Sequence, residues 1–121
     1  MPNSFMHIEL LLTDTSQAKS FYGKVFDWTF EEVPRGDNPY TMIQLGEGIG
    51  ANFMRSPLVN NSAPVWLAYV QVDDLNKALT AVESLGGTVM KARADEPGMG
   101  SFAIIKDPAG DMLGLWELAK S

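Results

Sequence analysis

The sequence has no cysteine and only one histidine among its 121 residues. Without cysteine, a disulfide scaffold, a zinc ribbon, an iron–sulfur centre and thiol catalysis are all excluded. A bound metal ion would have to take most of its ligands from carboxylate or amide oxygens. The cysteine pattern of small secreted domains is also missing, which predicts a cytoplasmic protein.

Basic residues are scarce as well. Nine Lys and Arg stand against fifteen Asp and Glu, and the net charge is −6. Because phosphate contacts dominate the affinity of proteins for nucleic acid, a chain without a basic stripe is not expected to bind it. The longest uncharged run, residues 56–72, is broken by prolines and polar residues, so no membrane span is expected. No basic leader precedes the first apolar stretch, so we expect no signal peptide.

The first apolar segment, residues 5–13, predicts a strand. Side chains alternate between the two faces of a strand. One face therefore carries Ile8, Leu10 and Leu12, and the other carries His7, Glu9 and Leu11. The aliphatic face is expected to pack on a helix, which leaves the polar groups on the opposite face.

A helix is predicted directly after this strand. Asp14 is a good N-cap, and Gln17 follows at the spacing of a capping box. The apolar positions form one stripe at helical spacing, namely Ala18, Phe21, Tyr22, Val25 and Phe26. We expect the helix to end near Asp27. Short strands are predicted at residues 28–33, 40–45 and 49–54, with Gly and Pro in the turns between them.

The second half of the chain repeats this pattern. After a linker at residues 56–64, a strand is predicted at residues 65–72, followed by a helix that Asp74 caps. The apolar stripe of this helix is Leu75, Ala78, Ala81, Val82 and Leu85. Gly86 and Gly87 end the helix. Strands are then predicted at residues 88–91, 101–106 and 111–117.

The repeat defines one α+β domain over residues 1–121. The caps Asp14 and Asp74 lie 60 positions apart, and each half has one strand, one helix and three strands. Repeat one covers residues 1–55 and repeat two covers residues 65–121. Because neither half closes its own sheet, the two sheets are expected to meet around a shared concavity.

Several motifs resemble those of the vicinal oxygen chelate superfamily. They are residues 13–22 and 72–78 at the two strand-to-helix entries, Leu85-Gly86-Gly87, Asp107-Pro108-Ala109-Gly110 and Gly114-Leu115-Trp116-Glu117. This superfamily holds glyoxalase I, bleomycin-resistance proteins, fosfomycin-resistance enzymes and extradiol dioxygenases. The chain is most similar to its branch of small glyoxalase-like proteins. The resemblance implies two βαβββ repeats that form a glyoxalase-like open barrel, or cup.

The resemblance also bears on metal binding. Enzymes of the superfamily usually hold one divalent ion at four equivalent strand positions, which here fall on His7, Asn52, Leu67 and Gly114. Leucine offers no donor atom and glycine has no side chain, so we expect neither the usual metal nor another cofactor. The alternative is a metal-dependent lyase or isomerase of the glyoxalase type that uses His7 and Glu9.

Strand alternation predicts which side chains line the cup between the repeats. The predicted binding residues are His7, Glu9, Asn52, Leu67, Tyr69, Met112, Gly114 and Trp116. A mostly apolar surface with a few polar groups is typical of a small-molecule site. We expect Gly114 to leave open volume there. His7 or Glu9 is a candidate general base, unless the two only hydrogen-bond their neighbours and fix the shape of the cup.

Three classes of function follow from these residues. The first is a metal-free protein that binds a small, largely apolar or cationic molecule, as bleomycin-resistance proteins do. The second is the metal-dependent enzyme, and the third is an accessory domain without chemistry. By analogy with two-repeat chains we expect a homodimer, because pairing would cover the edge strands. The sequence names no ligand and leaves catalysis open.

Overall fold

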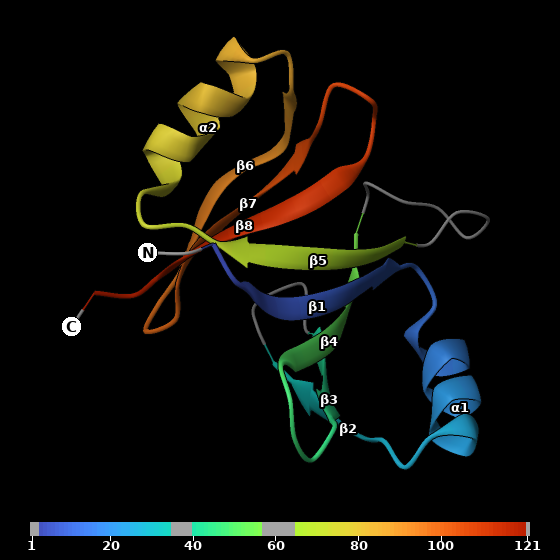
Figure 1. Ribbon diagram of the computed structural model, residues 1–121. Helices are drawn as coiled ribbons and strands as arrows, with labels where there is room; N and C mark the ends of the chain where they lie inside the picture. The colour runs from blue at the N-terminus through green and yellow to red at the C-terminus, as the bar shows by residue number, and fades with distance from the viewer. Residues whose placement is uncertain (1–2, 35–39, 57–64, 121) are drawn as a thin grey trace. The chain divides into compact units, whose positions relative to one another are not determined.

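The computed structural model describes residues 3–34, 40–56 and 65–120. Its elements follow the order βαβββ twice, which confirms the predicted α+β class with two repeats (Figure 1). Contacts group the chain into two compact units. The first unit spans His7–Leu67, and the second combines the first six residues with Ala68–Ser121. Residues 57–64, most of the predicted linker, lie outside the described residues.

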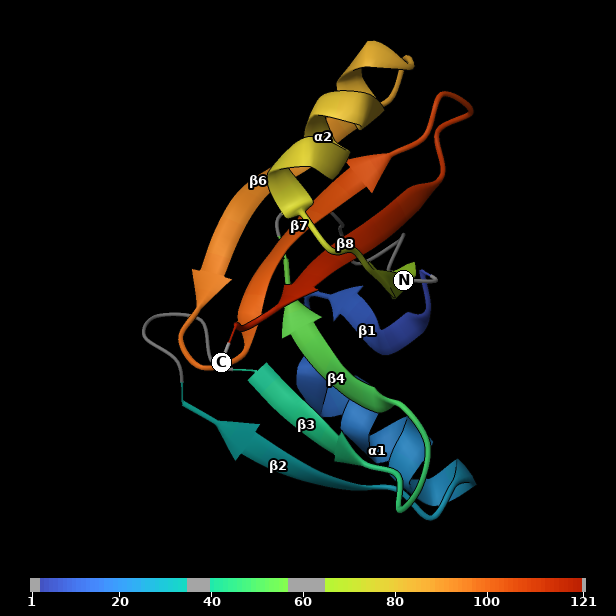
Figure 2. The same cartoon turned by 60° about the vertical axis from the view of Figure 1, so that its left-hand side comes forward.

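The first unit holds a sheet in the order β2-β3-β4-β1. Its elements are β1 (Phe5–Leu12), α1 (Thr15–Val25), β2 (Thr29–Val33), β3 (Tyr40–Gln44) and β4 (Gly50–Arg55). β1 and β4 are parallel, whereas β2, β3 and β4 pair antiparallel. The helix α1 lies behind one face of this sheet (Figure 2). The parallel pairing brings residues from the start and the end of the first repeat side by side.

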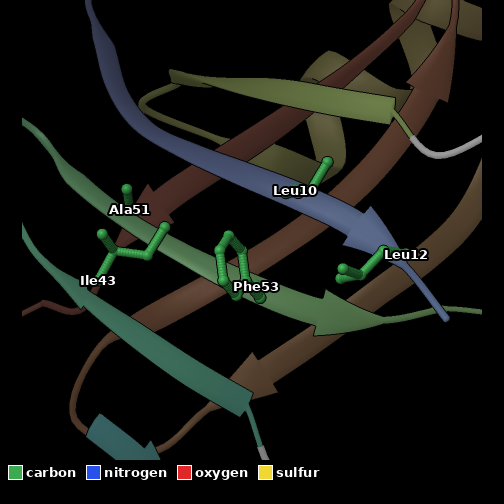
Figure 3. Close-up of a cluster of buried hydrophobic side chains, with 5 residues drawn as sticks. All are labelled: Leu10, Leu12, Ile43, Ala51 and Phe53. Carbon is green, nitrogen blue, oxygen red and sulfur yellow. The ribbon is translucent and has the colours of Figure 1, made fainter. Parts of the chain in front are cut away.

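The core of the first unit lies between this sheet and α1. Its buried residues are Leu10, Leu12, Ile43, Ala51 and Phe53 (Figure 3). Ala18 and Tyr22 of α1 pack against this cluster. The predicted aliphatic face of β1 therefore does pack on the helix, and this leaves the opposite face of β1 for its polar side chains.

The apolar stripe of α1 is narrower than predicted. Asp14 caps the helix as expected, since its Oδ1 accepts a hydrogen bond from the Gln17 amide at 3.1 Å. The helix ends at Val25, two residues before the predicted end. Phe21 is 60% exposed, so the prediction that it belongs to the helix core is wrong. Only the side of α1 that carries Tyr22 meets the sheet.

The second unit repeats the arrangement with a sheet in the order β5-β8-β7-β6. Its elements are β5 (Val65–Gln71), whose first three residues group with the first unit, α2 (Leu75–Ser84), β6 (Thr88–Glu96), β7 (Gly100–Lys106) and β8 (Met112–Leu118). β5 and β8 are parallel, and β8, β7 and β6 pair antiparallel. The strand β6 runs five residues beyond its predicted end at Lys91, because its polar second half still pairs with β7 through irregular register.

The helix α2 packs on the second sheet through a narrower stripe than predicted. The core holds Leu75, Ala103, Ile105 and Leu115, with Ala78, Leu79 and Val82 against it. Leu85 is 77% exposed and lies outside this core. Asp74 caps the helix as predicted, since its Oδ1 accepts from the Lys77 amide at 3.0 Å. Within the described residues, no helix has the length and apolarity needed to cross a membrane.

Candidate functional site

Three polar side chains meet on the face of the first sheet that points away from α1. The parallel register of β1 and β4 places Glu9 opposite Asn52 and His7 opposite Gly50. The His7 Nε2 lies 2.5 Å from the Asn52 Oδ1. The Asn52 Nδ2 donates to the Glu9 Oε2 at 2.9 Å. The sequence placed these residues on one side of the fold, and the structure joins them in one hydrogen-bonded cluster.

This cluster is buried rather than open to solvent. Asn52 is 3% exposed, Glu9 is 7% exposed, and His7 is half-buried. The Asn52 Nδ2 also donates to the Phe53 carbonyl at 3.3 Å. Both ends of the Asn52 amide are therefore engaged. A buried polar group gains most when its hydrogen bonds are made, so the amide ties His7 and Glu9 together.

The remaining predicted binding residues lie on other strands. Leu67 of β5 is fully buried and groups with the first unit by its contacts. Tyr69 of β5 lies opposite Gly114 of β8 in the second unit. Met112 begins β8 opposite Lys106 and is half-buried. The cup between the two repeats stays a prediction.

The space beside Gly114 is filled, which corrects the expectation of open volume. A Cβ built on Gly114 would lie 2.3 Å from the Tyr69 Cδ2 and 2.4 Å from its Cε2. Contacts between carbon atoms have their optimum near ~3.5–4.0 Å. The Tyr69 ring, 1% exposed, therefore covers the backbone at this position. A ligating side chain at Gly114 would need the ring to leave.

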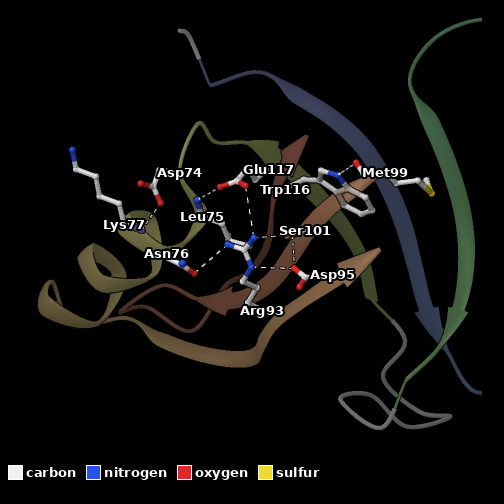
Figure 4. A network of polar contacts seen from close by, with 10 residues as sticks. All are labelled: Asp74, Leu75, Asn76, Lys77, Arg93, Asp95, Met99, Ser101, Trp116 and Glu117. Atoms are coloured by element: carbon white, nitrogen blue, oxygen red, sulfur yellow. Dashed lines mark hydrogen bonds and ion pairs between the residues drawn. The ribbon is translucent and has the colours of Figure 1, made fainter. Parts of the chain in front are cut away.

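Three aromatic rings form a cluster on this face of the second sheet. The rings of Phe102 and Trp116 stack with centroids 5.3 Å apart and an angle of 16°. Tyr69 meets both edge-on, at 5.6 Å from Trp116 and 6.2 Å from Phe102. The Trp116 Nε1 donates to the Met99 carbonyl at 3.1 Å, as Figure 4 shows. We refer to Tyr69, Phe102 and Trp116 as the aromatic cluster.

Sequence reasoning did not include Phe102 in the site. The sequence predicts its strand, but strand alternation was applied to the lining only for the opening and closing strands of the repeats, and Phe102 lies on neither. The alternation of β7 carries the missing signal, because Ala103 and Ile105 face α2 and Phe102 must face the other way. Lys91 of β6 was missed for the same reason, and its Nζ lies 5.7 Å from the Phe102 centroid.

The donor set does not fit the divalent metal usual in the superfamily. Leu67 carries no donor atom, and the Tyr69 ring covers the position of Gly114. The His7 Nε2 is bonded to Asn52. Among the residues that the structure describes, no three His, Asp or Glu side chains group in a way that could hold a metal ion. Zinc sites need three or four protein ligands. The described His, Asp and Glu side chains do not reach that number at any one place.

Glu117 points away from this face and serves a structural role. Its Oε1 accepts from the Leu75 amide at the start of α2 at 2.8 Å, and its Oε2 lies 3.8 Å from Arg93 (Figure 4). Arg93 also contacts Asp95 and Ser101. The Ser101 hydroxyl, with Arg93 beside it, holds the pKa of the Asp95 carboxyl below its usual value. This network fastens α2 to β6 and β8.

The two βαβββ units and their capped helices define a glyoxalase-like protein. Residues 4–115 match the family model of the Glyoxalase/Bleomycin resistance protein/Dioxygenase superfamily, and the chain belongs to that superfamily. The resemblance inferred from the motifs is thereby confirmed.

Two curated relatives extend well beyond this chain. It is 35% identical over 114 residues to the protein named "Putative glyoxylase CFP32" from Mycobacterium tuberculosis, which covers 91% of this chain and 44% of CFP32. It is 26% identical over 117 residues to the anthracycline biosynthesis protein DnrV of Streptomyces peucetius, which covers 85% of this chain and 42% of DnrV. The chain thus spans less than half the length of these relatives.

Solved structures share the fold at low sequence identity. The hypothetical protein BH1468 from Bacillus halodurans superposes with a TM-score of 0.71 and 12% identity, over 100% of this chain and 98% of that one. A methylmalonyl-CoA epimerase from Streptomyces coelicolor superposes with a TM-score of 0.68 and 12% identity, over 96% and 97% of the two chains. At these identities the likeness shows the fold alone.

Proposed function

We propose that this protein binds a small, largely apolar molecule through the aromatic cluster of its second unit, without the divalent metal usual in the superfamily. The observation that carries the proposal is the Tyr69 ring, which lies where a metal-ligating side chain at position 114 would begin. Aromatic rings stand there in place of a carboxylate, and Trp116 is the partly exposed member of the cluster. Aromatic side chains supply large contact areas for apolar ligands at little cost in conformational entropy.

Charge and the relatives support the same class of ligand. The net charge of −6 favours neutral or cationic molecules over anions. The similarity to an anthracycline biosynthesis protein suggests planar polycyclic aromatic compounds as the first probes. Such compounds match the stacked rings of Phe102 and Trp116 in shape.

The second candidate is a metal-dependent lyase or isomerase that uses His7 and Glu9. Its support is the superfamily itself and the shared fold with a methylmalonyl-CoA epimerase. The contacts of Asn52 argue against it, because this amide already occupies the His7 Nε2 and a Glu9 carboxylate oxygen.

Metal analysis distinguishes the two candidates. Protein dialysed in turn against Mn²⁺, Co²⁺, Ni²⁺ and Zn²⁺ and then against metal-free buffer is expected to retain no stoichiometric metal. His7→Ala is the control. Near-stoichiometric metal that disappears in His7→Ala would overturn the metal-free proposal and return the protein to the metal-dependent enzymes.

A fluorescence screen tests the aromatic cluster as the binding surface. A planar polycyclic aromatic probe is expected to quench tryptophan fluorescence, and Trp116→Phe is expected to remove most of that quenching. Trp66→Phe is the matched control, because Trp66 lies in the first unit and packs on Tyr22 and Phe53. Equal quenching in the two variants would argue against the aromatic cluster as the binding site. So would a screen in which no probe quenches the fluorescence to saturation.

A further inference from the structure

The orientation of the Asn52 amide is fixed by two acceptors. Its Nδ2 carries two hydrogens, one toward the Glu9 Oε2 at 2.9 Å and one toward the Phe53 carbonyl at 3.3 Å. A backbone carbonyl accepts hydrogen bonds and never donates them. The amide nitrogen must therefore face Phe53 and Glu9, and the amide oxygen must face His7.

This orientation decides which nitrogen of His7 carries the proton. The Asn52 Oδ1 lies 2.5 Å from the His7 Nε2. An amide oxygen is an acceptor only, so Nε2 must be the donor of that hydrogen bond. A neutral imidazole carries a single N–H, and a hydrogen bond at one ring nitrogen sets the state of the other. With the proton on Nε2, the lone pair lies on Nδ1.

We infer that Asn52, held by Glu9 and the Phe53 carbonyl, is a positioning residue that fixes neutral His7 as its Nε2–H tautomer. A metal ion that binds one imidazole nitrogen likewise determines whether the other nitrogen carries the proton, and here the Asn52 amide has that effect on His7. In this tautomer the Nδ1 can only accept a hydrogen bond.

Gly50 supports this geometry from β4. It lies opposite His7 in the parallel register. A Cβ built on Gly50 would lie 3.0 Å from the His7 Nδ1 and 3.4 Å from its Cε1. The lack of a side chain at Gly50 thus lets the imidazole ring lie with Nδ1 toward β4 and Nε2 toward Asn52. A larger residue would press on the edge of the ring that carries the lone pair.

Nitrogen NMR reads the tautomer directly. The chain has a single histidine, so ¹⁵N-histidine labelling gives one imidazole spin system without assignment. At a pH where the ring is neutral, we expect two well-separated ¹⁵N signals, with the protonated pyrrole-type nitrogen at Nε2. A proton on Nδ1, or signals averaged between the two tautomers in the wild type, would overturn the inference.

Two variants test whether Asn52 holds the tautomer. Asn52→Leu removes the acceptor, and we expect the two ¹⁵N signals to move toward each other as both tautomers become populated. Glu9→Gln keeps an oxygen acceptor for the Asn52 Nδ2 and is expected to retain the wild-type signals. Folded Asn52→Leu protein with an unchanged Nε2–H pattern would refute the positioning role.

A measurement on the wild type covers the case in which Asn52→Leu does not fold. The His7 Nε2–H proton should be slow to exchange and should show a nuclear Overhauser contact to the Asn52 side-chain amide. The absence of this contact in folded wild-type protein would refute the inference. A role confined to stability predicts neither the tautomer pattern nor this contact.

Discussion

The close approach of Tyr69 to Gly114 makes a specific prediction about stability. Gly114→Ala adds one methyl group to a strand backbone whose φ angle is not in the left-handed region. That methyl group would lie 2.3 Å, 2.4 Å and 2.7 Å from three atoms of the Tyr69 ring. Because the optimal separation of two carbon atoms is about 3.5–4.0 Å, the Tyr69 ring would have to move by about 1 Å. Tyr69 is nevertheless 1% exposed and packed against Phe102 and Trp116.

The magnitude follows from the cost of overpacking. Adding a methyl group to a well-packed core costs about 1–3 kcal/mol, and the short distances here place Gly114→Ala at about 2–3 kcal/mol. Tyr69→Ala removes the ring and, by the values for large aromatic residues, costs about 3–5 kcal/mol. In the Tyr69→Ala background the added methyl group meets no ring. Gly114→Ala should then cost close to zero, which corresponds to a coupling free energy of about 2–3 kcal/mol.

Urea unfolding of the four proteins of this double-mutant cycle measures that coupling. Far-UV circular dichroism is the suitable probe, because Trp116 touches the mutated site and would change its fluorescence. Gly23→Ala is the control, since this helical glycine has only the Phe30 ring nearby, at 3.2 Å, and alanine is the better helix former. An equal cost of Gly114→Ala in both backgrounds would refute the reasoning, because the ring would then not be the obstacle.

Three further predictions use the same unfolding assay. Phe53→Ala, at a residue 0% exposed, should cost about 3–5 kcal/mol, whereas Phe21→Ala, 60% exposed, should cost less than about 1 kcal/mol; similar losses would contradict the narrow core of α1. Glu117→Ala leaves the first amide of α2 without its acceptor and should cost about 1.5–3 kcal/mol; a neutral effect would show that the helix start does not depend on it. The Lys19 ammonium, with help from the Thr41 hydroxyl, holds the pKa of the Glu32 carboxyl below its usual value, so this pair stabilises the fold above the unfolded pKa of Glu and loses its effect as pH falls through the folded pKa. Lys19→Met should flatten this acid dependence by less than about 1 kcal/mol, because both side chains are partly exposed, and an unchanged pH profile would contradict the assignment.

Local sequence signals predicted the repeated order of the elements and the start of each helix. Asp14 and Asp74 cap α1 and α2 as their types and spacing indicated. The Asp107-Pro108-Ala109-Gly110 motif forms a turn in which Asp107 accepts from the Ala109 and Asp111 amides. Each of these features depends on residues within four positions of one another, so the chemistry that produces it is visible in the sequence.

The width of the helix stripes was less predictable. Apolar periodicity placed Phe21 and Leu85 in the core, yet both are exposed. Periodicity gives the direction of a helix face, but the sheet decides how much of that face it covers. The length of β6 was underestimated because its second half is polar, yet it still pairs with β7 through the backbone and through contacts of Arg93 and Asp95 with Ser101.

In the candidate site, too, the features that depend on neighbouring residues were predictable, whereas the contacts between strands far apart in the sequence were not. The sequence by itself determined the βαβββ repeat and the polar face of β1, because these depend on residue type and alternation. The resemblance to the superfamily implied that Leu67 and Gly114, which offer no side-chain donor, stand at metal positions. Only the tertiary structure decided that Asn52 joins His7 to Glu9 and that Tyr69 covers Gly114. Both contacts join strands more than 40 residues apart, and the parallel registers of β1 with β4 and of β5 with β8 create them.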